Sequence, residues 1–326
     1  MVTPDWPALL SGLRQGDRRA LSRLISLVEA RAPGWQEAMH GVFTMAGKAR
    51  AVGITGSLGT GKSTLTGRLA AVFAGRGRKV GILAVDPSSP FSGGAILGDR
   101  IRMPELDRLG VFLRSLATRG AHGGLSRATR DAVRILDAFG FDMILVETVG
   151  AGQDEVDVLR VADVTLVLSV PGQGDGLQAI KAGIMEIADV FVVNKADRSG
   201  ADHVVADIQA MLRITRGGVE GRAAPAVLKT VATTGAGIED VADAIESRIS
   251  TAVGRRSAGV GEISAEVVEL VEARLRDAFW TDFGARQRLD RLVAAGGDPY
   301  LICRDILPDD IFDELFAVPR RRLLPD

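Results

Sequence analysis

The sequence predicts an α/β fold in which helices cover both faces of a mostly parallel β-sheet, and three observations lead to this prediction. Between residues 49 and 252, apolar β-like runs alternate with amphipathic helical patterns. The runs are almost continuously apolar, which is typical of strands buried on both faces of a parallel sheet. A glycine-rich loop joins the first run to the first helix of this region, and such a loop is common at the carboxyl edge of an open α/β sheet.

The first 48 residues are helical by pattern and are expected to form an N-terminal helical segment. Leu9, Leu10 and Leu13 fall on one face, and after Gly16-Asp17 a second apolar face runs from Leu21 to Val28. These residues suggest no chemistry, so the prediction is only that this apolar face packs against something.

Residues 49–252 are expected to form the central α/β domain, and its strands follow in order along the chain. They are predicted at 51–55, 79–85, 111–117, 142–147, 164–170, 189–194 and 226–231.

Residues 253–326 are expected to form a C-terminal helical extension. Residues 253–261 read as a linker because they are rich in glycine. A long helix follows with Val267, Val271 and Leu275 among its apolar residues, and a further helix is predicted near 285–295.

Composition limits the class of protein. The chain has 326 residues, which suits one large α/β domain with additions. Its net charge of −1 gives no electrostatic reason to expect nucleic acid or an anionic membrane as a partner. With a single cysteine, Cys303, and neither a signal peptide nor a membrane-spanning run evident, the expected location is the cytoplasm.

The glycine-rich loop after the first strand matches the phosphate-binding pattern G-x-x-x-x-G-K-[ST], so the domain is predicted to be a P-loop NTPase. Backbone N–H groups of such a loop curl around phosphates, and the following helix adds a favourable dipole. Lys62 would reach the β- and γ-phosphates, and Ser63 would bind Mg²⁺. The expected phosphate-binding residues are Gly56, Ser57, Leu58, Gly59, Thr60, Gly61, Lys62, Ser63 and Thr64.

The sixth predicted strand ends in Asn194-Lys195-Ala196-Asp197, a pattern that predicts guanine as the base. The Asp197 carboxylate can accept hydrogen bonds from the N1–H and 2-amino groups of guanine. Adenine has no such donor pair and would leave a charge unpaired. The stem of Lys195 can lie over the base. The predicted ligands are therefore GTP and GDP with Mg²⁺.

Three further loops carry groups that could sense a γ-phosphate. Asp86 and Asp99 lie on the loop after the second strand, and both could approach Mg²⁺ directly or through water. Glu147 ends the fourth strand at the place of the acidic Mg²⁺ residue of P-loop enzymes, and Gly150 can offer its N–H to the γ-phosphate.

The third loop, residues 171–176, precedes a helix and is rich in glycine. Asp175 lies on this loop, and Gln178 and Lys181 lie on the helix that follows. The pattern leaves open whether this is a switch or an ordinary strand–helix loop.

Several segments of the chain resemble the MeaB/ArgK family of GTPases, which are associated with methylmalonyl-CoA mutase. The resemblance covers about residues 10–250. It rests on G-D-R-R-A-L-S-R-L-I-S-L-V-E (16–29), S-G-G-A-I-L-G-D-R-I-R-M (92–103), A-T-R-G-A-H-G-G-L-S-R-A-T (117–129), V-E-T-V-G-A-G-Q (146–153), P-G-Q-G-D-G-L-Q-A-I-K-A-G (171–183) and E-I-A-D-V-F-V-V-N-K-A-D.

This resemblance implies a homodimeric GTP-hydrolysing chaperone of an adenosylcobalamin-dependent acyl-CoA mutase. Such a chaperone gates cofactor delivery and protects or reactivates the mutase. The resemblance assigns catalysis to Lys62, Asp86 and Glu147, the metal and switch cluster to Ser63, Asp86, Asp99 and Glu147, and communication with the mutase to Asp175, Gln178 and Lys181. It also implies that the C-terminal helices form the dimer contact.

The chain departs from the family pattern at two places. Relatives usually carry proline where this P-loop has Ser57 and Leu58, so the loop is expected to bind phosphate with altered stiffness. The guanine loop usually reads T-S-A, whereas this chain has Thr230-Val231-Ala232. The Ala232 N–H is still expected to donate to guanine O6, although the side-chain hydroxyl of the usual serine is absent at Val231.

Other functions remain as alternatives. A metal-insertion GTPase would carry a His-rich tract or a Cys-x-x-Cys, whereas this chain has three scattered histidines and one cysteine. A protein-targeting GTPase would carry a methionine-rich domain, and the seven methionines do not cluster. A small-molecule kinase or transport-associated NTPase is opposed by the guanine motif. The identity of the client mutase, methylmalonyl-CoA, isobutyryl-CoA or another acyl-CoA mutase, stays open.

Overall fold

The computed structural model describes residues 4–86, 104–117, 124–148, 161–172, 188–215, 224–251, 260–281 and 285–294. The chain divides into two compact units, Met1–Arg256 and Ser257–Asp326. The N-terminal helices therefore share a unit with the α/β domain.

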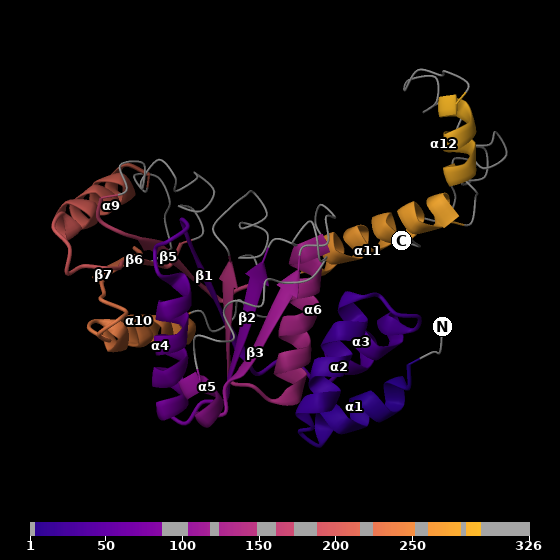
Figure 1. The fold of residues 1–326 in the computed structure, drawn as a ribbon, viewed down its shortest axis with the longest axis horizontal. Coiled ribbons are helices and arrows are strands. Elements are labelled where there is room, and N and C mark those ends of the chain that lie inside the picture. The colour runs from indigo at the N-terminus through magenta and orange to yellow at the C-terminus, as the bar shows by residue number, and fades with distance from the viewer. Residues whose placement is uncertain are drawn as a thin grey trace, which may run out of the picture. The chain divides into compact units, whose positions relative to one another are not determined.

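A seven-stranded sheet forms the centre of the first unit, in the order β3-β2-β4-β1-β5-β6-β7, and all of its pairings are parallel (Figure 1). The strands are β1 Arg50–Gly56, β2 Val80–Asp86, β3 Phe112–Ala117, β4 Met143–Thr148, β5 Val164–Ser169, β6 Val190–Val193 and β7 Ala226–Lys229. The predicted α/β fold is confirmed. Strand ends differ from the predicted ones by at most two residues, as at β7, which ends at Lys229 rather than 231.

Helices lie on both faces of this sheet. Successive residues of each strand point to opposite sides, so an apolar strand presents an apolar surface on each face. On β1, Val52 and Ile54 join a core with α4 and α10, whereas Ala51 joins a core with α6 and the N-terminal helices. The helices in the described part of this unit are α1 Trp6–Arg14, α2 Arg18–Glu29, α3 Trp35–Phe43, α4 Lys62–Gly75, α5 Pro104–Arg108, α6 Gly124–Phe139, α9 Ala201–Thr215 and α10 Ile238–Thr251. Both faces of the sheet are therefore covered, as predicted.

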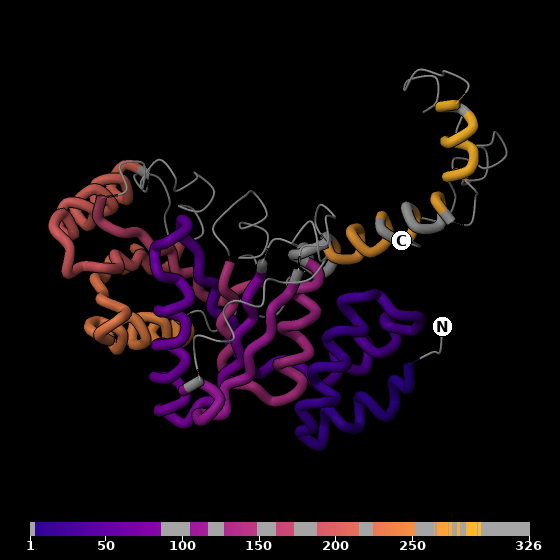
Figure 2. Tube along the Cα trace, in the orientation of Figure 1, coloured from indigo at the N-terminus to yellow at the C-terminus, as the bar shows by residue number. Residues whose placement is uncertain are grey.

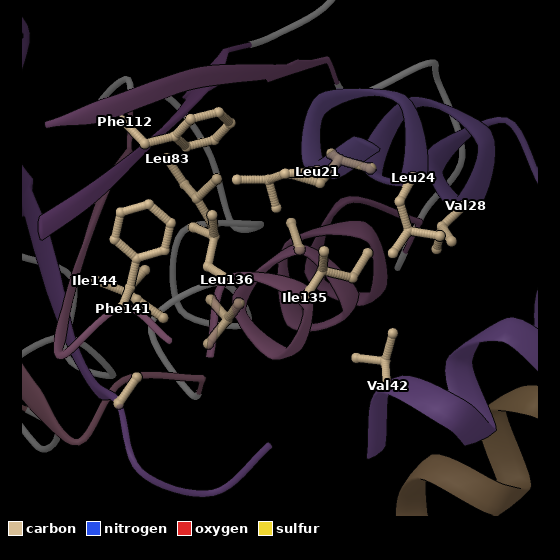
Figure 3. Packing of buried hydrophobic residues seen from close by; sticks show 14 of the residues in the cluster. Leu21, Leu24, Val28, Val42, Leu83, Phe112, Ile135, Leu136, Phe141 and Ile144 are labelled. Atoms are coloured by element: carbon tan, nitrogen blue, oxygen red, sulfur yellow. The ribbon is translucent and has the colours of Figure 1, made fainter. Parts of the chain in front are cut away.

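The apolar face predicted for the N-terminal segment is buried against α6. Leu21, Leu24 and Val28 of α2 point toward Ile135 and Leu136 of α6 in the core seen in Figure 3. Figure 2 traces the indigo N-terminal chain beside the magenta α6. Asp17 begins α2 by accepting a hydrogen bond from the Arg19 N–H at 2.8 Å, a capping role that fixes where the helix starts.

The start of β1 is held by a buried carboxylate from α6. Asp137 is buried and accepts hydrogen bonds from the N–H groups of Gly47, Lys48 and Ala49 at 2.6, 3.0 and 2.8 Å. Hydrogen bonds to a charged acceptor are among the stronger ones in proteins. This contact sets where the chain leaves the N-terminal helices and enters the strand that leads to the P-loop.

The second unit contains α11 Val260–Thr281 and α12 Ala285–Ala294, which contact each other. Both helices were predicted. The long helix begins at Val260, inside the predicted 253–261 linker, and residues 252–259 lie outside the described part of the chain. Within the described ranges, every helix is either too short or too polar to cross a membrane.

Candidate functional site

The P-loop follows β1, which lies in the sheet between β4 and β5. On one side of β1 the sheet continues through β4 to β2 and β3, and on the other side it continues through β5 to β6 and β7. A crevice outside the carboxyl ends of strands at such a switch point is the usual ligand site of an open α/β sheet. The predicted motifs after β1, β4, β6 and β7 meet at this one edge.

Glycine is required at two positions of the P-loop. Gly56 and Gly61 have φ of 145° and 90°, conformations that other residues rarely adopt. A Cβ atom on Gly56 would collide with the Leu168 carbonyl of β5, and one on Gly61 with the side-chain amide of Asn194. At these two positions the loop therefore packs directly against β5 and the guanine motif, with no room for a side chain.

Lys62 is the first residue of α4 and is only 7% exposed. Its Nζ donates hydrogen bonds to the carbonyl oxygens of Gly56 and Ser57, at 2.7 and 3.1 Å. The ammonium is thus drawn across the loop toward the place where the β- and γ-phosphates of a nucleotide bind in a P-loop. Leu58 is 74% exposed.

Two of the predicted Mg²⁺ residues are in direct contact. The Ser63 hydroxyl donates to Glu147 Oε1 at 2.6 Å, although the two residues are 84 positions apart. Glu147 pairs in register with Ile54, two residues before the P-loop begins at Gly56. A hydroxyl and a carboxylate are oxygen ligands of the kind that Mg²⁺ prefers, so this pair fits the predicted ion.

The other predicted metal residues are less fully described. Asp86 is the last residue of β2, at the same edge of the sheet and in register with Ala117, but its side chain lies outside the described atoms. Asp99 and Gly150 also fall outside, as do Asp175, Gln178 and Lys181. In the described part of the chain, His, Cys, Asp and Glu do not come together in groups of three or more that could hold a metal.

Asn194 links the P-loop to the loop after β7. It is 2% exposed, and its Nδ2 donates to the Thr60 carbonyl at 2.8 Å. Its Oδ1 accepts from the Thr230 hydroxyl and from the Ala232 N–H, both at 3.1 Å. These three hydrogen bonds of one buried amide join the phosphate segment to the base segment.

Lys195 and Asp197 of the guanine motif are less buried than Asn194. Lys195 has φ of 54°, and its Nζ donates to the Gly59 carbonyl at 2.7 Å, so its stem spans from β6 to the P-loop. Asp197 is exposed, which leaves its carboxylate accessible to a base. The Ala232 N–H, expected to meet guanine O6, donates to Asn194 in this structure. Val231 beside it forms a bridge with Ala236.

Arg68 was not among the predicted site residues, yet it holds the guanine loop from α4. Its Nε donates to the Ala232 carbonyl at 3.2 Å, and its Nη2 donates to the Thr233 carbonyl at 3.0 Å. The contact spans 164 positions of sequence. An exposed arginine on a helix carries no pattern that would reveal such a contact in advance.

A second arginine of the same segment, Arg76, ties the end of α4 to α10. It forms ion pairs with Glu239, Asp243 and Glu246, which lie along one face of α10. The hydrogen bond that Arg76 donates to Glu239 is the main reason that the pKa of Arg76 is raised above its ordinary value. The bonds to Asp243 and Glu246 add to this rise, and burial opposes it. Because α10 follows the guanine loop, Arg68 and Arg76 hold both ends of that segment to the P-loop helix.

Comparison with known proteins gives consistent results. The model of the family described as methylmalonyl Co-A mutase-associated GTPase MeaB matches residues 21–283. A putative GTPase of Pyrococcus horikoshii is 49% identical over 240 residues, which cover 73% of this chain and 76% of that protein. A fused isobutyryl-CoA mutase of Geobacillus kaustophilus is 38% identical over 210 residues, which are 61% of this chain and 19% of that protein.

One solved structure matches nearly the whole chain. It is described as a LAO/AO transport system kinase, with a TM-score of 0.67 and 26% identity, and the match covers 96% of this chain and 100% of that one. Its similarity supports the P-loop fold argued above from the sheet order and the loop geometry.

Proposed function

Because this chain belongs to the MeaB family of methylmalonyl-CoA mutase-associated GTPases, and is therefore a P-loop GTPase, we propose that it is a chaperone of an adenosylcobalamin-dependent acyl-CoA mutase. In this proposal, hydrolysis of GTP gates the loading of the cofactor and protects or reactivates the mutase. Methylmalonyl-CoA mutase and isobutyryl-CoA mutase are the first clients to test.

The observation that carries the proposal is that a segment similar to this chain is fused to a mutase in one relative. A segment of the fused isobutyryl-CoA mutase that covers 19% of that protein is 38% identical to this chain. Fusion keeps two modules at a high effective concentration, which is useful when they act on each other. We propose that this chain makes the same kind of contact with a separate mutase.

The site geometry supports hydrolysis of GTP. In this proposal Lys62, which reaches back to the Gly56 carbonyl, contacts the β- and γ-phosphates, and the hydrogen-bonded pair Ser63 and Glu147 holds Mg²⁺. When bound, Mg²⁺ neutralises charge that develops on the phosphate oxygens. The Ser63 hydroxyl donates its proton to Glu147 and keeps two oxygen lone pairs, so it could coordinate the ion without losing this hydrogen bond. We propose Asp86 and Asp99 as further members of this metal set.

Coupling to the mutase is assigned to Asp175, Gln178 and Lys181. A client that prefers one nucleotide state must change the affinity for nucleotide by the same factor. The segment that carries these residues begins just after β5, the neighbour of β1 in the sheet. We propose that a change in this segment reaches the phosphate site through β5.

The proposal is tested by the rate of GTP hydrolysis with and without each candidate mutase. The cognate mutase is expected to stimulate hydrolysis. Lys181→Ala and Asp175→Ala should reduce the stimulation and leave the basal rate largely intact. If none of the adenosylcobalamin-dependent mutases binds or stimulates the protein, the chaperone function is wrong and the protein is a GTPase with another role.

The description of the matched structure as a transport system kinase favours one alternative, transfer of the γ-phosphoryl group to a small acceptor. The two functions differ in the fate of the phosphate. A GTPase releases one inorganic phosphate for each GDP formed, whereas a kinase releases less because the acceptor keeps the phosphoryl group. Measuring both products in one reaction with the candidate acceptor separates them.

A further inference from the structure

A cavity of about 810 Å³ lies between α2 and the segment from α5 to the start of β3. Its α2 wall consists of Arg18, Arg19, Ser22, Arg23 and Ser26. Because the opposite wall includes the first residues of β3, the cavity is at the amino end of that strand, whereas the nucleotide site is at the carboxyl ends. It is therefore separate from the GTPase site.

The charges of the three arginines in this wall are not neutralised by an ion pair within the described residues. None of Arg18, Arg19 and Arg23 forms an ion pair with an acid in the described part of the chain. Arg18 donates a hydrogen bond to the Gly110 carbonyl, which carries no charge. Three carboxylates are near: Asp5 and Asp17, which share a neighbouring pocket with Arg19 and Arg23 and cap α1 and α2, and Asp107, which forms an ion pair with none of the three arginines.

This arrangement is unfavourable for α2 by itself. The first turn of α2 contains no acidic residue and begins with two arginines, although the amino end of a helix favours negative charge. Arg19 and Arg23 also lie four positions apart, where like charges destabilise a helix. An anion bound in the cavity would remove both penalties.

The other groups of the cavity suit a small phosphorylated ligand. The Ser26 hydroxyl is engaged within the protein, because it accepts from Arg114 Nη2 and donates to the Ser22 carbonyl, both at 3.0 Å, while Glu29 neutralises the charge of Arg114. Ser22 offers a hydroxyl to a ligand, and Leu106 and Leu113 supply apolar surface on the opposite side. The volume lies within the roughly 300–1,000 Å³ that is typical of small-molecule sites.

We propose that this cavity is a second ligand site, which binds a phosphorylated small molecule with at least two negative charges. The guanidinium forks of Arg19 and Arg23 bind the phosphate groups, because this geometry matches phosphate oxygens in pairs. The apolar wall of α5 and β3 takes the non-phosphate part. In this proposal the segment 16–29, which takes no part in the nucleotide site, binds the second ligand.

The test uses the full chain with GDP and Mg²⁺ at saturation, so that the P-loop is filled. Pyrophosphate, inorganic phosphate and a short glutamate peptide are titrated separately by calorimetry. One pyrophosphate is expected to bind per chain. Binding should weaken at least about tenfold in the double variant Arg19→Gln, Arg23→Gln, since two charge-assisted contacts are lost. The matched control is Arg213→Gln, an exposed arginine on α9, and it should bind like the wild type.

Thermal unfolding supplies an independent readout that does not depend on turnover. Without pyrophosphate the double variant should melt at or above the wild-type temperature, because like charges have been removed from α2. With pyrophosphate only the wild type and the control should gain stability, as expected for a ligand that binds the folded state. Three results would overturn the proposal: no pyrophosphate binding at millimolar concentration, equal binding by the double variant, or tighter binding of the glutamate peptide than of pyrophosphate.

Discussion

At the scale of single residues, Asp197 is the side chain on which the choice of base depends. It is exposed beside Lys195 at the end of β6, so its carboxylate is open to solvent until a base arrives. We expect Asp197→Asn to weaken GTP binding by at least about tenfold, because a hydrogen bond to a charged group is worth about 1.5–3 kcal/mol. The same variant should bind xanthosine triphosphate better, since the new amide can donate to its 2-oxo group.

Calorimetric titration with GTP, ATP and xanthosine triphosphate measures this change. Asp207→Asn, an exposed aspartate on α9, is the matched control and should leave all three affinities unchanged. Equal affinity of the wild type for ATP and GTP would show that the guanine assignment is wrong.

Glu147 permits a second prediction at this scale. Glu147→Gln keeps an oxygen that can accept the Ser63 hydrogen bond but removes the negative charge that favours Mg²⁺. Turnover of GTP should fall at least about tenfold, because metal and positioning supply most of the catalysis in phosphoryl transfer. GDP affinity should fall much less, since it depends mainly on the P-loop and the base contacts. A wild-type hydrolysis rate in this variant would remove Glu147 from the metal set.

At the scale of the elements, α4 organises the whole nucleotide site. Its first turn carries Lys62 and Ser63, Arg68 in its middle holds the guanine loop, and Arg76 at its end binds α10. One rigid helix thus connects the phosphate site with the base site. A contact that fixes the guanine loop should affect nucleotide binding, whereas a contact that only fixes α10 should affect stability.

Two arginine variants of this helix separate these effects. Arg68→Met retains the apolar stem but loses two hydrogen bonds to loop carbonyls, each worth about 1 kcal/mol, so GDP affinity should fall about five- to thirtyfold. Arg76→Met should lower the free energy of unfolding by about 1 kcal/mol, as expected for a partly exposed ion-pair network, with little change in GDP affinity. Titration with GDP and denaturant unfolding measure the two quantities. If Arg68→Met binds GDP like the wild type, the guanine loop keeps its position without this contact.

The sequence predicted the elements and the motifs of the site better than the contacts between them. Continuous apolar runs locate the strands because a parallel sheet covered on both faces excludes polar residues from them. The P-loop and the Asn194 motif are local patterns and can be recognised as such. Asn194 links Thr60 to Ala232, and Arg68 donates a hydrogen bond to the Ala232 carbonyl. Both are tertiary contacts, so neither follows from local sequence. The arginines of α2 read as a solvated helix face until the cavity beside them is seen.

At the scale of the whole molecule, the proposed homodimer requires an apolar surface that a second copy can cover. In α11, Val267, Val268, Val271 and Leu275 are 50%, 55%, 50% and 54% exposed. At 3.6 residues per turn these four positions fall within about 100° of one another, so they form one stripe along the helix. A stripe of this width normally packs against another element, and we propose that it packs against its counterpart in a second chain.

The double variant Val268→Glu, Leu275→Glu places two charges on this stripe, and they would be buried without partners in a dimer. Burial of an unpaired charge costs several kcal/mol, so the variant should be a monomer at concentrations where the wild type is a dimer. The GTPase site lies in the other compact unit, and GDP affinity should therefore persist. Sedimentation equilibrium measures the mass, and Glu272→Gln, an exposed polar change on the same helix, serves as the control. A monomeric wild type, or a double variant that remains a dimer, would show that this stripe is not the dimer contact.

Because the client mutase is assigned to the segment after β5, stimulation of GTP hydrolysis by the mutase should survive in the monomer. Loss of the stimulation in the monomer would show that the client binds both copies at once.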